Sequence, residues 1–210
     1  MRRPDEATLV AVVIYDGVEP IDIGGTIGVI SMAARVLPGL RAAVVAEQPG
    51  PVRCAGGLTV LAQHGFADAP AADALLVTGG PGWRTEAANP AMLGFLRAQD
   101  PDRLMSVCTG ALILGAAGLL AGRAATTRRR AVGAETDSPL ALLAAQGAQA
   151  REAQVVDDGT GPASAGGVSL AIDGTLHLLG RLYGEAARDE VAALIEYDRA
   201  FAANLAALGR

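Results

Sequence analysis

Short, continuous apolar runs alternate along the chain with longer segments of helical periodicity. The apolar runs indicate strands buried on both faces, because a strand covered on one face only would alternate apolar and polar residues. The predicted strands are 8–15, 42–46, 57–63, 74–78, 103–107, 124–127 and 154–156, and the predicted helices are 21–37, 90–98, 111–120, 140–146, 166–183 and 185–208. Strands joined through helices pair in parallel beneath helical layers. The pattern therefore predicts an α/β fold, a three-layer sandwich around a flavodoxin-like, mostly parallel sheet.

The length and the composition of the chain predict a single soluble domain with an aliphatic core. The 210 residues fit a single domain spanning 1–210, and 51% of them are hydrophobic although only 3% are aromatic. We therefore expect a core of Ala, Val, Leu and Ile, which suits close packing of helices on a sheet. The polar N-terminus has no signal-peptide pattern, and no uncharged apolar run reaches the roughly 20 residues of a membrane span. A cytoplasmic location without membrane contact is expected.

The charge of the chain limits the kinds of partner that we expect it to bind. All 17 basic residues are Arg, and the formal net charge is −5. Nucleic acid is not expected as a partner, because phosphate binding needs a clustered positive surface. The absence of Lys excludes Schiff-base chemistry. A small-molecule substrate is the expected ligand.

The residue with the clearest chemical potential is Cys108. The predicted strand 103–107 runs through Cys108 and Thr109-Gly110 into a helix that begins at Ala111. An abrupt strand-to-helix turn is typical of a nucleophile elbow, which exposes one side chain and places helical N–H groups beside it. We expect an exposed Cys108 whose thiolate the helix dipole favours. The alternative is a cysteine packed as a small hydrophobic residue.

Three segments are expected to meet at one edge of the sheet, since ligands of open α/β sheets bind beyond the carboxyl ends of the strands. These segments are 16–22, 79–83 and 108–110. Asp22, between Ile21 and Ile23, is expected to have a raised pKa and to transfer protons, unless it merely caps a helix. The glycine-rich turn after strand 74–78 is either a simple turn or an oxyanion hole. In the second case the donors are the N–H groups of Gly80, next to Gly79, and of Thr109.

Few other side chains offer reactive groups. His177 falls on an apolar helix and His64 in a turn, so neither is expected to lie beside the elbow. Cys54 lacks the elbow context and is interpreted as structural. Two cysteines and two histidines are too few for a thiolate or histidine metal cluster, and no metal or organic cofactor is expected.

Several motifs together resemble the ThiJ/PfpI superfamily, whose fold is similar to class I glutamine amidotransferases. The motifs are Ile21-Asp22-Ile23, Val77-Thr78-Gly79-Gly80, Ser106-Val107-Cys108-Thr109-Gly110-Ala111, Gly118-Leu119-Leu120-Ala121-Gly122-Arg123-Ala124-Ala125-Thr126-Thr127, and Gly166-Gly167 with Ile172-Asp173. The resemblance spans nearly the whole chain. It is strongest to isonitrile hydratases and to the sensor domains of related transcription regulators.

The resemblance implies roles for individual residues and a homodimer with the site near the subunit interface. Cys108 is the expected nucleophile, Asp22 its acidic partner, Thr109 a further site residue and Gly80 an oxyanion donor. Two positions depart from the family pattern: Arg128 follows Thr126-Thr127 where the family often has His, and Gly24-Gly25 replaces Gly-Pro. Arg128 can lower the pKa of Cys108 or hold an anionic substrate group, but it cannot accept a proton. Alternatively, the arginine run beginning at Arg128 is a solvated loop.

The function that the resemblance implies is hydration of an isonitrile to an N-substituted formamide, a lyase reaction. Cys108 would attack the terminal carbon while Asp22 supplies the proton, and water would release the product from a thioimidate. Two alternatives stay open. One is a non-enzymatic stress protein that senses redox state or a metabolite, and the other is a glyoxalase-like enzyme acting on 2-oxoaldehydes through the same cysteine.

Overall fold

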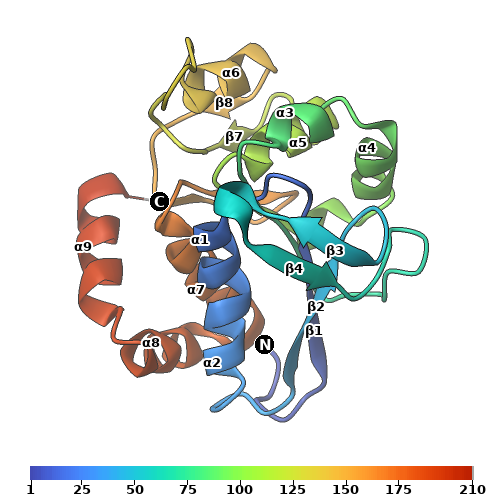
Figure 1. Cartoon of the computed structure of the whole chain (residues 1–210). Coiled ribbons are helices and arrows are strands. Elements are labelled where there is room, and N and C mark those ends of the chain that lie inside the picture. The colour runs from blue at the N-terminus through green and yellow to red at the C-terminus, as the bar shows by residue number, and fades with distance from the viewer. Residues whose placement is uncertain (210) are drawn as a thin grey trace.

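A six-stranded sheet forms the centre of the computed structural model, which describes residues 1–209 (Figure 1). Its strands, in spatial order, are β2 (Leu40–Val45), β1 (Thr8–Val13), β5 (Ala74–Val77), β6 (Leu104–Val107), β10 (Ala163–Ala165) and β9 (Val155–Val156). Neighbouring strands are parallel except for β9, which runs antiparallel to β10. The predicted mostly parallel sheet is confirmed.

Helices cover both faces of the sheet, as the three-layer prediction requires. On one face lie α1 (Pro20–Ile23), the π-helical turn η1 (Gly24–Gly28), α2 (Val29–Ala33) and α7 (Leu170–Tyr183), which pack on one another, with α8 (Glu185–Leu194) against α7. The other face carries α3 (Trp83–Glu86), α4 (Pro90–Arg97), α5 (Gly110–Ala116) and α6 (Pro139–Ala145), with α5 in contact with the other three (Figure 1). The described core is aliphatic and alanine-rich, as expected.

A glycine at position 25 allows η1 and α7 to pack closely. A Cβ at Gly25 would stand 2.7 Å from that of Ala171, and the Thr175 hydroxyl donates to the Gly25 carbonyl at 2.8 Å. The Gly24-Gly25 departure from the family pattern therefore lies in the contact between η1 and α7, and neither glycine lines the cavity described below.

Several boundaries differ from the prediction. The segment 21–37 is helical only to residue 33 and contains the π-helical turn, and the helix expected from 166 starts at Leu170. The predicted helix 185–208 is wrong as one element: α8 ends at Leu194 and α9 (Asp198–Leu208) follows, because Glu196 adopts a left-handed φ of 56° that a continuous helix cannot contain.

Three strands were not expected from the hydrophobic pattern. Among them, β10 consists of Ala-Ser-Ala, too short and too weakly apolar to stand out. The other two, β3 (Gly50–Arg53) and β8 (Gln149–Ala150), pair outside the main sheet with β4 (Thr59–Ala62) and β7 (Ala124–Ala125). Of the predicted strands, 57–63 and 124–127 are longer than the observed β4 and β7.

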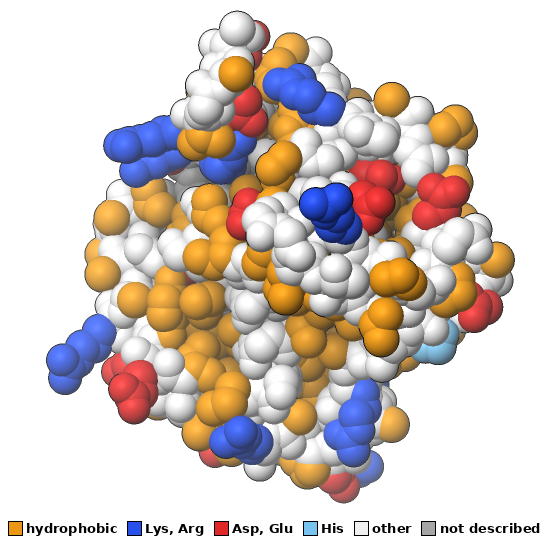
Figure 2. All heavy atoms as spheres, viewed as in Figure 1, with side chains coloured by type: hydrophobic (Ala, Val, Ile, Leu, Met, Phe, Trp, Pro, Cys, Tyr) orange, Lys and Arg blue, Asp and Glu red, His pale blue; other side chains and the backbone are white. Residues whose placement is uncertain are grey.

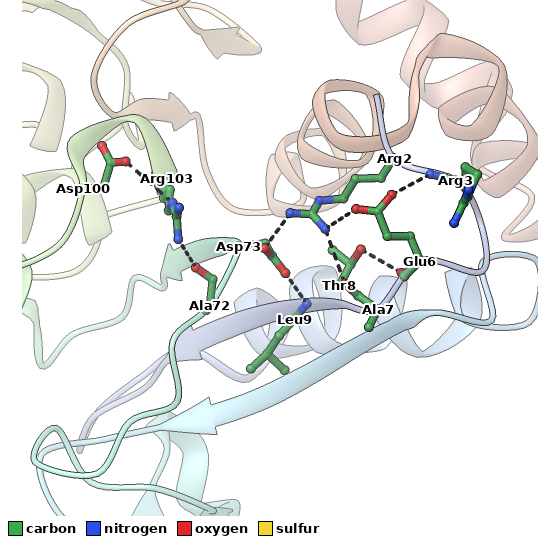
Figure 3. A network of polar contacts seen from close by, with 10 residues as sticks. All are labelled: Arg2, Arg3, Glu6, Ala7, Thr8, Leu9, Ala72, Asp73, Asp100 and Arg103. Atoms are coloured by element: carbon green, nitrogen blue, oxygen red, sulfur yellow. Dashed lines mark hydrogen bonds and ion pairs between the residues drawn. The ribbon is translucent and has the colours of Figure 1, made fainter.

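Polar contacts hold the N-terminal segment to the sheet and the C-terminal helix to α7. Near the N-terminus, the Arg2 guanidinium donates to Asp73 Oδ1 at 2.6 Å, and Asp73 Oδ2 accepts the Leu9 N–H at 2.8 Å (Figure 3). Near the C-terminus, the buried Asp173 carboxylate accepts from Tyr197 at 2.9 Å and from Asn204 at 3.2 Å. These contacts hold α9 against α7.

Within residues 1–209, no helix has both the length and the apolar character needed to cross a bilayer.

Candidate active site

The turn from β6 into α5 has the geometry of a nucleophile elbow. Cys108 adopts a φ of 53°, a left-handed conformation that is unfavourable for a residue with a side chain. Two contacts hold this conformation: the Cys108 N–H donates to the Gly166 carbonyl at 3.1 Å, and the Thr127 hydroxyl donates to the Cys108 carbonyl at 2.7 Å. Gly110 fits where a Cβ would stand 2.2 Å from the Val77 carbonyl oxygen. The predicted abrupt turn is confirmed.

The three segments expected to meet at the sheet edge do so. The Gly79 carbonyl accepts the Glu19 N–H at 2.9 Å, and the Gly79 N–H donates to Asp22 Oδ2 at 2.7 Å. The Gly80 N–H donates to the Thr109 hydroxyl oxygen at 2.9 Å. Three loops distant in sequence thus become one hydrogen-bonded unit above the carboxyl ends of β1, β5 and β6.

Cys108 differs from its expected state, because only 3% of its surface is exposed. Burial, together with the negative charge of Asp22, raises the pKa of the thiol to about 12. The Thr109 N–H and the Arg128 guanidinium lower this pKa, but by less than burial raises it. The expectation of an exposed cysteine with a favoured thiolate is therefore wrong: Cys108 is buried, and its environment favours the thiol.

Asp22 is the carboxyl group that interacts with this thiol. It is fully buried, and burial raises the pKa of its carboxyl to about 7, although the hydrogen bond from Gly79 opposes the shift. Its Oδ1 atom has no hydrogen-bond partner among residues 1–209. Asp22 and Cys108 each shift the pKa of the other, so they form an interacting pair. The N-cap of α1 is Glu19, so Asp22 is not the capping residue of the alternative interpretation.

The proposed oxyanion donors are already engaged in this conformation. The Gly80 N–H bonds to the Thr109 hydroxyl and the Gly79 N–H to Asp22. The Thr109 N–H, by contrast, faces the sulfur of Cys108 and lowers its pKa. An oxyanion role for Gly80 stays a prediction that requires the Thr109 hydroxyl to turn away.

An open cavity of about 680 Å³ lies over this unit. Its lining residues are Glu19, Gly80, Pro81, Trp83, Arg84, Cys108, Thr109, Arg128, Val132, Ala134, Glu135, Thr136 and Val168. Its volume falls within the range of about 300–1,000 Å³ common for small-molecule sites. The sulfur of Cys108 therefore borders a space that can receive a ligand even though little of its surface is exposed.

Arg128 faces the cavity. Its guanidinium donates to both carboxylate oxygens of Glu135, at 2.7 and 2.8 Å, and only 12% of its side chain is exposed. The solvated-loop interpretation is therefore wrong for Arg128, although it fits Arg129, whose half-exposed side chain pairs with Glu152. Glu135 and Val168 were not singled out from the sequence: Glu135 comes from a loop without a recognisable motif, and Val168 directly follows the Gly166-Gly167 motif.

Both histidines lie away from the elbow, as expected. Neither lines the cavity. His177 lies on α7, and its Nε2 is 2.7 Å from Asp157 Oδ2. His64 Nδ1 is 4.0 Å from Asp68 Oδ2. Cys54 is buried and forms no disulfide, in keeping with its structural interpretation.

Replacing Gly79 by Ala is expected to disturb the unit directly. The new Cβ would stand 2.5 Å from the Thr109 nitrogen and 2.8 Å from the Cys108 Cβ, atoms that the elbow holds in place. Overpacking of this kind destabilises by about 1–3 kcal/mol, measurable as the free energy of unfolding in urea. Gly28→Ala is the control, because its Cβ would meet nothing within 4 Å. Equal stability of Gly79→Ala and Gly28→Ala would contradict the close approach of Gly79 to Thr109 and Cys108.

The comparisons with known proteins show the family of this chain. Residues 8–177 match the DJ-1/PfpI family, and the chain belongs to that family, as the sequence motifs predicted. Among curated relatives, an isonitrile hydratase of Pseudomonas putida is 32% identical over 193 residues, which cover 91% of this chain and 79% of the relative. An uncharacterized protein of Streptomyces lividans, from the cpoL 5' region, is 38% identical over 120 residues, or 56% of this chain and 85% of the relative.

Solved structures show the same fold. A ThiJ/PfpI family protein from Pseudomonas syringae superposes with a TM-score of 0.77 at 28% identity, covering 93% of this chain and 77% of that one. DJ-1beta of Drosophila melanogaster superposes with a TM-score of 0.73 at 18% identity, covering 90% of this chain and 98% of that one. The second likeness concerns the fold alone.

Proposed function

We propose that the protein hydrates an isonitrile to an N-substituted formamide, with Cys108 as nucleophile and Asp22 as the group that moves protons. The observation that carries the proposal is the buried pair itself, a thiol and a carboxyl whose pKa lies near neutrality, beside a cavity that no histidine lines within residues 1–209. An enzyme that relies on a Cys–His relay would lack its base here. A carboxyl with a pKa of about 7 can both accept and donate a proton at neutral pH.

The first half of the reaction joins the thiol to the substrate. The Asp22 carboxylate accepts the proton of the Cys108 thiol as the sulfur attacks the terminal carbon of R–N≡C, forming the carbon–sulfur bond. The protonated Asp22 then gives this proton to the same carbon. The product is a thioimidate, R–N=CH–S–Cys108, which contains every atom of the isonitrile and of the thiol.

The second half releases the formamide. Asp22 accepts a proton from water as the water oxygen bonds to the thioimidate carbon, and then gives this proton to the imine nitrogen. The carbon–sulfur bond breaks as the new hydroxyl becomes the formamide carbonyl, the hydroxyl proton passes through Asp22 to the sulfur, and R–NH–CHO leaves. One water is consumed and no oxidant or reductant is needed. Thr109, whose N–H faces the sulfur, stabilises negative charge on it in both halves.

The isonitrile hydratase relative supports this reaction more than the two alternatives. That relative is 32% identical over 91% of this chain. Reversible oxidation proceeds through a resting thiolate, a form that the burial of Cys108 disfavours. Within the proposal, Cys108 becomes nucleophilic only when Asp22 takes its proton during the reaction.

The pH dependence of formamide production tests the proposal. Asp22 must be a carboxylate to accept the thiol proton, so kcat/KM for a simple alkyl isonitrile is expected to rise about tenfold per pH unit below about 7 and to level off above it. Glu19→Gln removes a negative charge that raises the pKa of Asp22, so it should move this midpoint to lower pH. A flat profile from pH 5 to 9, or no formamide at all, would overturn the proposal.

A homodimer is part of the proposal. Hydrophobic side chains gather over α1, α2 and α7 and over the β3–β4 hairpin on one face (Figure 2). The exposed Ile21, Leu58 and Leu61 belong to α1 and to the hairpin segment, and the hairpin contacts the loop before α1 through the hydrogen bond from Ala55 to Val18 at 2.8 Å. Association through these apolar residues would place the partner beside the site. Sedimentation at micromolar concentration tests this expectation.

A further inference from the structure

Four charged side chains line the cavity: the guanidinium groups of Arg84 and Arg128 and the carboxylates of Glu19 and Glu135. Glu19 comes from the loop before α1, and the other three come from α3 and the loop that contains Val132 and Thr136. Isonitrile and formamide groups are uncharged, so the proposed reaction does not use these charges. Arg128 nevertheless lies near the reactive pair, because its charge lowers the pKa of both Cys108 and Asp22.

Arg128 already holds a carboxylate. Its Nη2 donates to both oxygens of Glu135, and one of these oxygens also accepts the Val132 N–H at 2.9 Å. One guanidinium nitrogen thus contacts both carboxylate oxygens, and such charge-assisted hydrogen bonds are stronger than those between neutral groups. Glu135 belongs to a loop without helix or strand, and its side chain is only 19% exposed. The position of the Glu135 carboxylate at Arg128 is therefore a place in the cavity where a carboxylate group fits, and we call it the carboxylate seat.

Arg84 supplies a second guanidinium beside that seat. Its guanidinium carbon lies 4.4 Å from the centre of the Trp83 ring, a cation–π contact that restrains it, and it has no ion pair among residues 1–209. Its charge is close enough to Glu135 to contribute, with Arg128, to the lowered pKa of that carboxyl. A carboxylate at the seat is thus near two cations: Arg128, which is paired with Glu135, and Arg84, which has no ion pair among the described residues.

We propose that the substrate carries a carboxylate group, which replaces Glu135 at Arg128 and is attracted by Arg84 while the reacting carbon lies at Cys108. The cavity of about 680 Å³ has room for a substituent that extends from the sulfur to this seat. The inference rests on the proposed function only in assuming that the substrate binds over Cys108.

Alkylation of Cys108 by iodoacetate and by iodoacetamide tests the carboxylate seat without any isonitrile. The two reagents deliver the same methylene to sulfur but differ in carrying a carboxylate or an amide. The rate ratio, iodoacetate over iodoacetamide, is measured by mass spectrometry of the peptide that contains Cys108 and is divided by the ratio for a small free thiol. The low reactivity of the buried thiol cancels in this ratio.

The normalised ratio is expected to exceed one in the wild type and to fall about fivefold in Arg84→Gln, the effect of one partly exposed charge pair. In Glu135→Gln, which removes the internal competitor, the ratio is expected to rise. Arg129→Gln is the matched control, since Arg129 follows Arg128 in the loop but does not line the cavity, and its ratio should equal that of the wild type. A wild-type ratio of one, unchanged in Arg84→Gln and Glu135→Gln, would overturn the inference.

The outcome separates the two proposals. A protein that hydrates alkyl isonitriles but shows no preference for iodoacetate retains the proposed function and loses the carboxylate seat. A protein that prefers iodoacetate through Arg84 and Glu135 but yields no formamide retains the seat and loses the isonitrile reaction.

Discussion

Replacing Cys108 by Ala is expected to reduce isonitrile hydration by roughly a thousandfold or more, as the loss of a covalent nucleophile does in enzymes that act through one. Without the sulfur no thioimidate forms, and the neutral isonitrile carbon faces only water. The measurement is formamide released per enzyme at saturating isonitrile. Cys54→Ala is the matched control: it removes the other buried cysteine, which lies outside the cavity, and should retain turnover.

The fold of the Cys108→Ala variant is verified by its thermal transition. A folded variant that hydrates isonitriles at the wild-type rate would exclude covalent catalysis through sulfur. In that case Asp22 would have to activate water directly.

Replacing Asp22 by Asn is expected to abolish turnover while stabilising the fold at alkaline pH. The pKa of Asp22 is raised from 3.8 to about 7, so the folded state disfavours the carboxylate. At pH below the unfolded value both states are protonated and the effect is absent. Between about pH 4 and 7 the unfolded chain loses the proton first, so the destabilisation grows, and above about 7 it is complete.

The size of this effect follows from the shift. At 1.36 kcal/mol per pKa unit, a shift of about three units corresponds to about 4 kcal/mol of lost stability above pH 7. Asn is nearly isosteric and can still accept the Gly79 N–H through its oxygen. The stability gain of Asp22→Asn, measured by urea unfolding, should therefore be larger by roughly 2–3 kcal/mol at pH 8 than at pH 5.

The control is Asp157→Asn, which is expected to lower the stability of the fold, whereas Asp22→Asn is expected to raise it. The hydrogen bond to His177 lowers the pKa of Asp157 to about 2, so its carboxylate stabilises the folded state above the unfolded pKa, and the variant should lose stability at both pH values. A stability difference between Asp22→Asn and wild type that is the same at pH 5 and pH 8 would contradict the raised pKa of Asp22.

The sequence was most informative where chemistry and local conformation coincide. The elbow at Cys108 and the meeting of the three loops were predictable, because parallel strands bring their carboxyl ends to one edge and a strand–Gly–helix junction requires a sharp turn. The raised pKa of Asp22 was predicted from its flanking Ile21 and Ile23, but its cause is the complete burial of Asp22, since Ile21 itself is exposed.

Properties that depend on contacts between distant segments were not predictable. Cys108 is buried partly because the backbone at Gly167 covers it: a Cβ there would stand 2.8 Å from the sulfur. A single sequence does not reveal that residues 59 positions away lie over the thiol, so its exposure and the direction of its pKa shift were predicted incorrectly. Glu135 was missed for the same reason, since only the folded loop brings it to Arg128.

The most direct test of the central claim is mass spectrometry of the wild-type protein, quenched at successive times during the first turnover of an isotopically labelled isonitrile. The account predicts a transient adduct on the peptide that contains Cys108, heavier by the mass of one intact isonitrile, which decays as labelled formamide appears. Release of formamide in the first turnover while Cys108 stays unmodified at every time would contradict it.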